Sequence, residues 1–580
     1  MKKIYYLLVA ALFGLVSCQE TIFDEDITQE ADLVVIPMPN LPTIQYDGDP
    51  IILGRRLDNP YSLNNMRTAF HNIQPEMSDA GIEEEDIVTT HYYVRFRPDN
   101  EEELQDIKAQ YSDFELYEYP LDYEMSGRVS YHDPEIPDSL PTYQYASIDS
   151  VSWNTIPLPQ NIDYEIIERL FIPDEDLDVE EGMQMCATRS SSYNDALESL
   201  VNESMRLTGN LEEDEIPENG MMSSNSTWYP SGRITAYDDI VDGQIPLEGV
   251  KVRARRWFTT HTAVTDANGE FLMNKGFKNK ANYSIVWEGD MWDIRDGYIG
   301  QAYYNGPKKK GAWNLEIGND NYKSVRYAAI HRAVYRMKKG ETYGISRIAS
   351  DENTIISYMH DYNEDAYADY NREMGFGIFH DIRVFGMYNP TDFHMIHMIV
   401  ANTFHELGHA SHFTNGESNY RNSDKNLRES WASFVGFYLT LMEYQDLGFY
   451  HGPFDYGSYE PYPYTMSTYY IPDGSINRQL TIVNEEEEYL PIFIDMYDSD
   501  NQHITNILYN PNDYNNIDYY PYDTIRIIPA DIIEDFVFNS RTILSTKNKL
   551  IDFYNSIDDY EKNRYKLTPE SINSLFLLYQ

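Results

Sequence analysis

The sequence predicts a multidomain α+β protein, and three observations support this. The chain has 580 residues, more than one compact core usually accommodates. Short strand-like runs separated by turns occupy the stretch 230–290, whereas apolar residues recur at helical spacing after residue 390. A third region, before residue 125, mixes both patterns. We therefore expect a small α/β N-terminal unit, then a β-sandwich, then a mainly helical domain.

The composition is that of a folded, strongly acidic protein. Hydrophobic residues make up 42 % of the chain and aromatic residues 14 %. Lys and Arg number 44 against 95 Asp and Glu, so the net charge is −51. This charge disfavours nucleic acids and anionic membrane surfaces as partners. We expect no nucleic-acid partner.

The N-terminus has the features of an export signal. Basic residues in Met1–Lys3 precede an apolar run, Ile4–Val16, that is too short to span a bilayer. We therefore expect residues 1–17 to be a lipoprotein signal peptide. Leu15–Cys18 resembles the bacterial lipobox, which implies cleavage before Cys18 and its lipidation. An ordinary signal peptide with an incidental cysteine is the alternative.

Residues 18–45 read as a polar, acidic tether. An acidic stretch directly after such a cysteine is similar to the surface-export signals of Bacteroides-type lipoproteins. The resemblance implies an outer-membrane lipoprotein at the cell surface, with the periplasmic face as the alternative. Lipid would then be the membrane anchor. Only Cys186 remains after Cys18, so the mature chain can form no intramolecular disulfide.

Residues 46–125 are expected to form the small α/β unit. The segments His91–Arg97 and Phe114–Tyr119 read as strands. Pro60–Ile73 reads as a helix, and Glu101–Tyr111 as another with an acidic first turn. The simplest interpretation is that this unit is a structural domain, and a prodomain or docking module is the alternative.

The next two segments differ sharply in pattern. Residues 126–225 are rich in Pro, Asp and Glu, and we expect linker and packing elements there, with one helix at Tyr193–Thr208. Residues 226–300 contain strand-like runs and an Asn-Gly turn. The runs Gly249–Val252 and Thr265–Phe271 resemble the carboxypeptidase-regulatory-like, prealbumin-type β-sandwich. The resemblance implies a domain that orients an enzyme, with glycan or protein binding as the alternative.

Residues 315–580 carry the motif that suggests chemistry, H-E-x-x-H at His405–His409. Residues four apart lie above one another on a helix, so His405 and His409 can hold one metal ion from the same side. Glu406 lies about 100° round the helix, where it can reach a metal-bound water. Zinc suits imidazole ligands, and a catalytic zinc uses three protein ligands plus a water whose pKa falls to roughly 7. We therefore expect Glu406 to be the catalytic base.

The third ligand must lie further along the chain. Asn415 stands where the metzincin pattern needs a histidine, so that arrangement is excluded. Three carboxylates remain, and Glu417 and Asp424 lie in a polar loop. Glu429 opens a strongly apolar helical run, and a ligand on a second packed helix is held rigidly. We therefore expect zinc to be bound by His405, His409 and Glu429.

These residues resemble the gluzincins, zinc peptidases with HExxH on one helix and a glutamate on a following helix. His405–His409, then 19 residues, then Glu429 is similar to the HExGH…E signature of the enhancin and mucin-glycopeptidase group. The added His412 is similar to thimet-type oligopeptidases, although packing near the site is its expected role. The resemblance implies a zincin catalytic domain that hydrolyses peptide bonds in proteins or glycoproteins.

The resemblance also implies two accessory features. A strand at 376–385 would pair with extended substrate, or else be a buried structural strand. A Tyr or His would stabilise the oxyanion, with His451, Tyr456, Tyr459 and His503 eligible. A surface adhesin or glycan-binding lipoprotein with a silent zincin domain is the alternative function. A purely structural metal, which would need a fourth protein ligand, is a lesser one.

Overall fold

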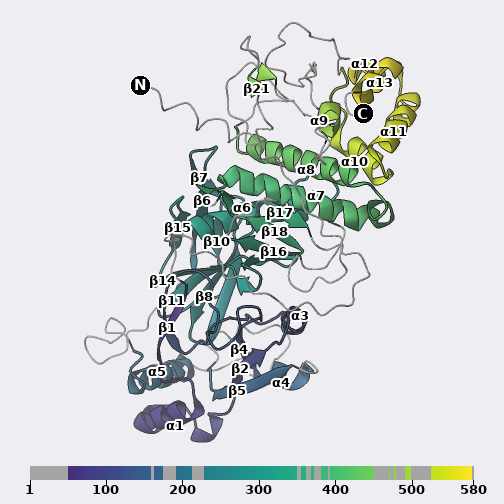
Figure 1. Cartoon of the computed structure of the whole chain (residues 1–580). Helices are drawn as coiled ribbons and strands as arrows, with labels where there is room; N and C mark the ends of the chain where they lie inside the picture. Colours follow the sequence, from purple (N-terminus) through teal and green to yellow (C-terminus); the bar gives the residue numbers. More distant parts are fainter. Residues whose placement is uncertain are drawn as a thin grey trace, which may run out of the picture.

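The chain contains both helices and strands, and the strands form several separate sheets, so the protein is a mixed α+β fold, as the sequence predicts. In the computed structural model, the N-terminal elements, the β-strands of the middle of the chain and the C-terminal helices follow one another (Figure 1). Cys18 and the segments 1–17 and 18–45 lie outside the described residues. The structure describes residues 50–157, 162–173, 191–211, 227–348, 354–360, 368–370, 381–389, 392–449, 469–470, 476–477, 490, 492–497 and 524–577.

The N-terminal unit is built on an antiparallel sheet in the order β4-β2-β5. Strand β2 and helix α3 lie where the sequence predicts them, but Tyr117 forms only a single bridge to Tyr145 instead of a strand. Strands β4 and β5 and helix α5 come from 126–225, where linker and packing elements were expected, and they complete the sheet and its core. The elements are β1 Ile52–Arg56, α1 Leu63–Asn72, α2 Gln74–Asp79, β2 His91–Arg97, α3 Glu101–Gln110, β3 Tyr123–Ser126, β4 Gln144–Asp149, α4 Ser150–Thr155, β5 Asp163–Leu170 and α5 Ser191–Leu207.

Two four-stranded sheets follow. One has the order β10-β6-β15, with β7 paired to β6, and the other has the order β14-β11-β8-β9. Apolar side chains of both sheets share one buried core, which includes Ile234, Val252 and Ile285. The sheets continue beyond residue 300. Their strands are β6 Ser231–Asp238, β7 Gly243–Pro246, β8 Lys251–Arg256, β9 Thr259–Val264, β10 Glu270–Leu272, β11 Ala281–Val286, β14 Tyr303–Lys309 and β15 Trp313–Ile317.

A five-stranded sheet in the order β13-β12-β16-β18-β17 lies next to the helices. Strands β12, β16 and β18 are parallel to one another, and β17 is antiparallel at the edge. Strands β12 and β13 fall between β11 and β14 in sequence, so the chain leaves the sandwich sheets, builds this sheet and returns. The two regions are therefore interwoven. The strands are β12 Trp292–Asp296, β13 Gly300–Gln301, β16 Thr354–Met359, β17 Ala368–Tyr370 and β18 Ile382–Phe385.

The C-terminal part is mainly helical. Helices α6, α7 and α8 pack side by side, and α7 also contacts β17 and β18 (Figure 1). Within the described residues, no helix is long and apolar enough to cross a membrane. The remaining elements are α6 Tyr322–Lys338, β19 Met387–Asn389, β20 Asp392–Phe393, α7 Ile396–Tyr420, α8 Lys425–Asp446, β21 Tyr469–Tyr470, β22 Ile476–Asn477, α9 Ile492–Tyr497, α10 Ala530–Phe538, α11 Ile543–Ser556, α12 Asp559–Arg564 and α13 Pro569–Leu577.

Candidate metal centre

Helices α7 and α8 approach each other closely because a glycine on each faces the other helix. A Cβ on Gly408 would lie 3.0 Å from Val435 Cβ, and one on Gly436 would lie 3.0 Å from the carbonyl oxygen of Ala401. Side chains at these positions would push the helices apart. The close packing brings Glu429 of α8 against the histidines of α7.

His405, His409 and Glu429 form one buried group. Glu429 Oε2 lies 3.3 Å from His405 Nε2 and 3.5 Å from His409 Nε2. One ligand atom from each residue lies within 4.8 Å of the others, and the side chains are at most 3 % exposed. The structure thus brings together the three residues that the sequence analysis selected as ligands.

The other two candidate carboxylates are used elsewhere. Glu417 accepts a hydrogen bond from Arg421 Nε at 3.0 Å on the protein surface. Asp424 accepts one from the Leu427 N–H at 2.9 Å and caps the N-terminus of α8. Neither belongs to the buried group.

The group fits a metal ion because its donor atoms are otherwise unsatisfied. His405 Nε2 and both carboxylate oxygens of Glu429 are buried and, among the described residues, have no partner in a well-formed hydrogen bond. Buried polar atoms of this kind are rare in proteins and require an explanation. A cation between two imidazole nitrogens and a carboxylate would satisfy them.

The protonation states also suit a metal. Burial lowers the pKa of His405, although Glu429 acts in the opposite direction. Burial alone would raise the pKa of Glu429, but His409 and His405 beside it lower that pKa to about 2. Neutral imidazoles and an ionised carboxylate are the forms that bind metal ions.

Two hydroxyl groups orient the histidine rings from the side away from Glu429. Ser433 Oγ lies 3.3 Å from His405 Nδ1, and Tyr420 Oη lies 3.3 Å from His409 Nδ1. Such contacts fix which ring nitrogen is available to a metal. The sequence analysis missed both residues. Ser433 could have been found, because it follows Glu429 by one helical turn.

Glu406 lies beside the group without belonging to it. Its Oε1 is 4.0 Å from His405 Nε2, and the side chain is fully buried. A carboxylate in this position can exchange protons with a molecule at the centre without being a ligand itself.

Aromatic rings surround the centre. His412 stacks on Phe538, with ring centroids 4.7 Å apart, and meets the edge of Tyr420. It is not part of the ligand group, so it packs near the site, as expected. Tyr370 of β17 lies parallel to His409, with centroids 6.2 Å apart.

The strand expected to pair with substrate takes an inner position. The described part of 376–385 forms β18, which lies between β16 and β17. The alternative expectation, a buried structural strand, therefore describes β18 better. Strand β17 forms the edge of the described sheet. The four residues proposed for the oxyanion, at 451, 456, 459 and 503, lie outside the described residues.

The end of β6 anchors helix α7, which carries His405 and His409, to the sheet that contains β6. Asp239 accepts hydrogen bonds from the backbone N–H of Ile396 at 2.6 Å and of His397 at 3.2 Å, at the first turn of α7. A carboxylate there satisfies otherwise unpaired N–H groups and interacts favourably with the helix dipole. The His397 side chain also contacts Asp239, which explains this histidine without a metal.

Asp238, the preceding residue, extends the attachment to the neighbouring helices. It accepts hydrogen bonds from Arg332 of α6 at 2.7 Å and from Tyr444 of α8 at 2.8 Å. Arg332 also donates to Glu443 of α8 at 3.0 Å. One strand end therefore holds all three helices around the centre.

Comparisons with known family models, curated proteins and solved structures found no match for this chain. The candidate centre is therefore defined by its own geometry: two histidines and a glutamate, all buried on two packed helices, with a second carboxylate, Glu406, beside them.

Proposed function

We propose that this protein is a zinc metallopeptidase of the gluzincin type that hydrolyses peptide bonds in proteins or glycoproteins. The observation that carries the proposal is the buried group of His405, His409 and Glu429 with Glu406 beside it. In this proposal the helical region with its five-stranded sheet is the zincin catalytic domain. The two preceding sheets are the prealbumin-type sandwich that orients it.

Zinc is the metal that suits this donor set best. Two imidazoles and one carboxylate are the ligands of one common class of catalytic zinc site. Three protein ligands leave one coordination position open, whereas a structural zinc site has four. Among the described residues, no fourth His, Cys, Asp or Glu joins the group. This favours a catalytic role over a structural one.

The chain's own residues divide the chemistry between them. A bound zinc would polarise the scissile carbonyl and lower the pKa of an attacking water. Glu406 takes the proton that this water releases and returns it to the leaving amine. Ser433 and Tyr420 hold the two histidine rings in the orientation that keeps both Nε2 atoms at the centre.

The proposed location is the outer membrane, with Cys18 lipidated and the catalytic region outside the cytoplasm. Lipidation at Cys18 predicts that Cys18→Ala releases the protein from the membrane fraction. Tight membrane association of that variant would contradict the lipobox interpretation.

The substitution Glu406→Gln tests the proposed activity. Gln cannot accept the proton, so hydrolysis should fall by about 10²–10⁴-fold. Zinc content and folding should stay unchanged, because Glu406 is not a ligand. The assay offers casein, mixed peptides and O-glycosylated mucin, and Glu417→Gln, an exposed carboxylate of the same helix, is the matched control.

Two results would contradict the proposal. If zinc-loaded wild type cleaves none of these substrates, the alternative of a binding lipoprotein with a silent zincin domain replaces it. If wild type and Glu406→Gln cleave equally, the activity belongs to another site or to a contaminant.

A further inference from the structure

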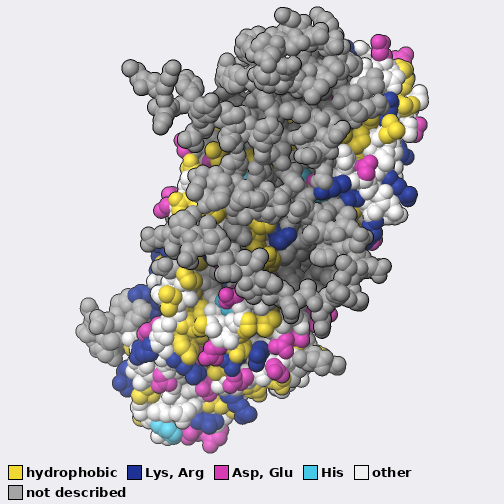
Figure 2. Space-filling model, in the orientation of Figure 1, with side chains coloured by type: hydrophobic (Ala, Val, Ile, Leu, Met, Phe, Trp, Pro, Cys, Tyr) yellow, Lys and Arg dark blue, Asp and Glu magenta, His cyan; other side chains and the backbone are white. Residues whose placement is uncertain are grey.

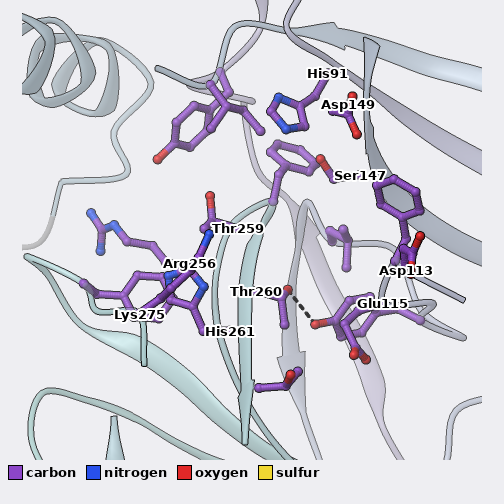
Figure 3. Close-up of a pocket in the computed structure, with 18 of the residues that line it drawn as sticks. His91, Asp113, Glu115, Ser147, Asp149, Arg256, Thr259, Thr260, His261 and Lys275 are labelled. Carbon is purple, nitrogen blue, oxygen red and sulfur yellow. Dashed lines mark hydrogen bonds between the residues drawn. The ribbon is translucent and has the colours of Figure 1, made fainter. Parts of the chain in front are cut away.

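A cleft of about 480 Å³ lies between the N-terminal unit and the sandwich sheets (Figure 3). This volume is within the range of sites that bind small ligands or short segments. Strand β9 forms one wall. The segment 113–117 and residues of β4 form the other. None of the residues that line it comes from α7 or α8, so the cleft is separate from the metal centre.

Strand β9 presents its edge to this cleft. It is the last strand of its sheet and, among the described strands, pairs with β8 alone. Every residue from Phe258 to Thr262 lines the cleft. A strand that turned one face toward the cleft would contribute only alternate residues, because its side chains point to opposite sides. In an antiparallel strand, backbone groups alternate between the two edges, so part of the β9 backbone is directed away from β8.

The sequence of this edge lacks the charged residues and prolines that commonly discourage strand pairing. Proteins commonly protect exposed strand edges with charged residues, especially Lys, or with Pro. Thr259–Val264 reads TTHTAV, without Pro, Lys, Arg, Asp or Glu. Thr262 is exposed, and Val264 is 61 % exposed. An uncharged edge that lines a cleft is a template for an added strand.

The floor of the cleft is aromatic. Phe258, Phe277 and Tyr117 are buried beneath it, and the His261 ring lies 4.5 Å from that of Phe277. Tyr117 Oη and Thr260 Oγ1 form a hydrogen bond of 2.8 Å across the walls (Figure 3). Such a floor can accept an apolar side chain.

Charges of both signs line the rim. Arg256 and Lys275 lie on one side of the cleft, and Asp113 and Glu115 on the other (Figure 3). Acidic and basic side chains are interspersed over the lower part of the molecule, where the N-terminal elements lie (Figure 1 and Figure 2). The cleft therefore does not select a strongly charged ligand, although the chain as a whole carries −51.

We propose that the cleft binds an extended peptide segment, which pairs with β9 as an added strand. Main-chain hydrogen bonds to β9 supply the affinity, and alternate side chains of the peptide enter the aromatic floor. The proposal does not depend on the proposed peptidase activity. It adds a second peptide-binding site, away from the metal centre.

Alternate N-methylation of a bound peptide tests the pairing directly. The full mature chain carrying Glu406→Gln, which prevents cleavage, is used to select a decapeptide from a random library. The fluorescein-labelled peptide is then synthesised in two forms, each N-methylated at alternate residues. In an added strand, only alternate N–H groups point toward β9. One of the two methylated forms therefore lacks the N–H groups that pair with β9, and the other form keeps them. That form should bind at least ~10-fold more weakly, because several hydrogen bonds are lost, and the other should bind as before.

Two variants of β9 locate the site. Thr262→Lys places a charge on the edge within the cleft and should weaken binding. Val264→Lys, on the same strand but outside the residues that line the cleft, should not. In hydrogen exchange, the peptide should protect backbone amides of β9.

The proposal is overturned if no library peptide binds, if both methylated forms bind equally, or if Thr262→Lys binds like wild type. Displacement of the peptide by free O-glycans released from mucin would assign the cleft to carbohydrate instead.

Discussion

Two of the clusters of buried titratable side chains in this protein differ in how their charges are balanced. The first, here called the Arg295 cluster, joins the N-terminal unit to β12. It consists of Glu101, Lys108, Glu288, Asp293 and Arg295. The second is the metal centre of His405, His409 and Glu429.

Each charge in the Arg295 cluster has an opposite charge beside it. Arg295 lies 2.6 Å from Asp293 and 2.9 Å from Glu101, and Lys108 lies 2.6 Å from Asp293 and 2.8 Å from Glu288. Two cations therefore offset three carboxylates. Such a cluster needs no external ion, and its role is to join two regions of the structure.

The candidate metal centre has no Lys or Arg within its ligand group. Burial lowers the pKa of His405, which disfavours the imidazolium that would balance the charge of Glu429. Burial of a charge is costly unless the charge is paired. Burial alone thus does not distinguish a binding site from a structural cluster. What distinguishes them is the partner of each carboxylate: Lys or Arg lies beside every carboxylate of the Arg295 cluster, whereas the groups beside Glu429 are histidines.

The largest effect on stability is expected from Arg295→Met. Removing the cation leaves Asp293 and Glu101 buried without their main partner, which should cost about 3–5 kcal/mol. The zinc content per folded chain should not change. Calorimetry and metal analysis of the same preparation measure both quantities. Loss of zinc in a folded Arg295→Met protein would show that the two clusters are coupled.

A smaller effect is expected from Tyr420→Phe, which removes the hydroxyl beside His409 Nδ1. Removing such a contact typically weakens metal binding by about 10–100-fold. Competition with a zinc chelator measures the affinity. Tyr438→Phe, a tyrosine of α8 that donates to the Tyr343 carbonyl instead, is the control. Equal affinities for wild type and Tyr420→Phe would remove Tyr420 from the centre.

The smallest effect concerns pH and Glu118, which lies near the Arg295 cluster. Burial raises the pKa of Glu118 to about 8, although the Gln301 N–H donates to it and Arg295 is near. When the pKa of a carboxyl group is higher in the folded chain than in the unfolded chain, its protonated form favours the fold. For a Glu this contribution to stability is complete below the unfolded pKa of about 4.3. That stability is lost as the pH rises through the folded pKa.

Wild type should therefore lose stability between about pH 4.3 and pH 8. Glu118→Gln should lose less over this range. Unfolding midpoints at pH 5 and pH 8 measure the difference. Parallel pH profiles for the two proteins would show that Glu118 titrates normally.

The metal centre was largely predictable because its geometry is local. The spacing of His405 and His409 defines one helix face, and Glu429 was selected by the apolar helix that it opens. Ser433 lies one helical turn after Glu429 and could have been predicted from that spacing, whereas the single hydroxyl of Tyr420 carries no distinctive pattern. Both hydroxyls contact the histidine rings, and the orientation of those rings is defined only once the helices are packed.

The fold was predictable in class but not in its strand partners. Helix α3 and strand β2 follow from local patterns and lie at their expected positions. Strands β12 and β13 leave the sandwich sheets to join β16, which lies far along the chain. The apolar alternation of β12 would suit either sheet, so the sequence pattern could not assign it. Strands β4 and β5 fall in 126–225, where the Pro, Asp and Glu content led us to expect linker and packing elements.

The zinc content of Glu429→Ala tests the central claim most directly. Wild-type protein should contain stoichiometric zinc, and folded Glu429→Ala should lose it, because one of three ligands is gone. Glu417→Ala and Asp424→Ala, which remove the two rejected carboxylates, should retain it. Stoichiometric zinc in folded Glu429→Ala, or its absence from wild type supplied with zinc, would contradict the account.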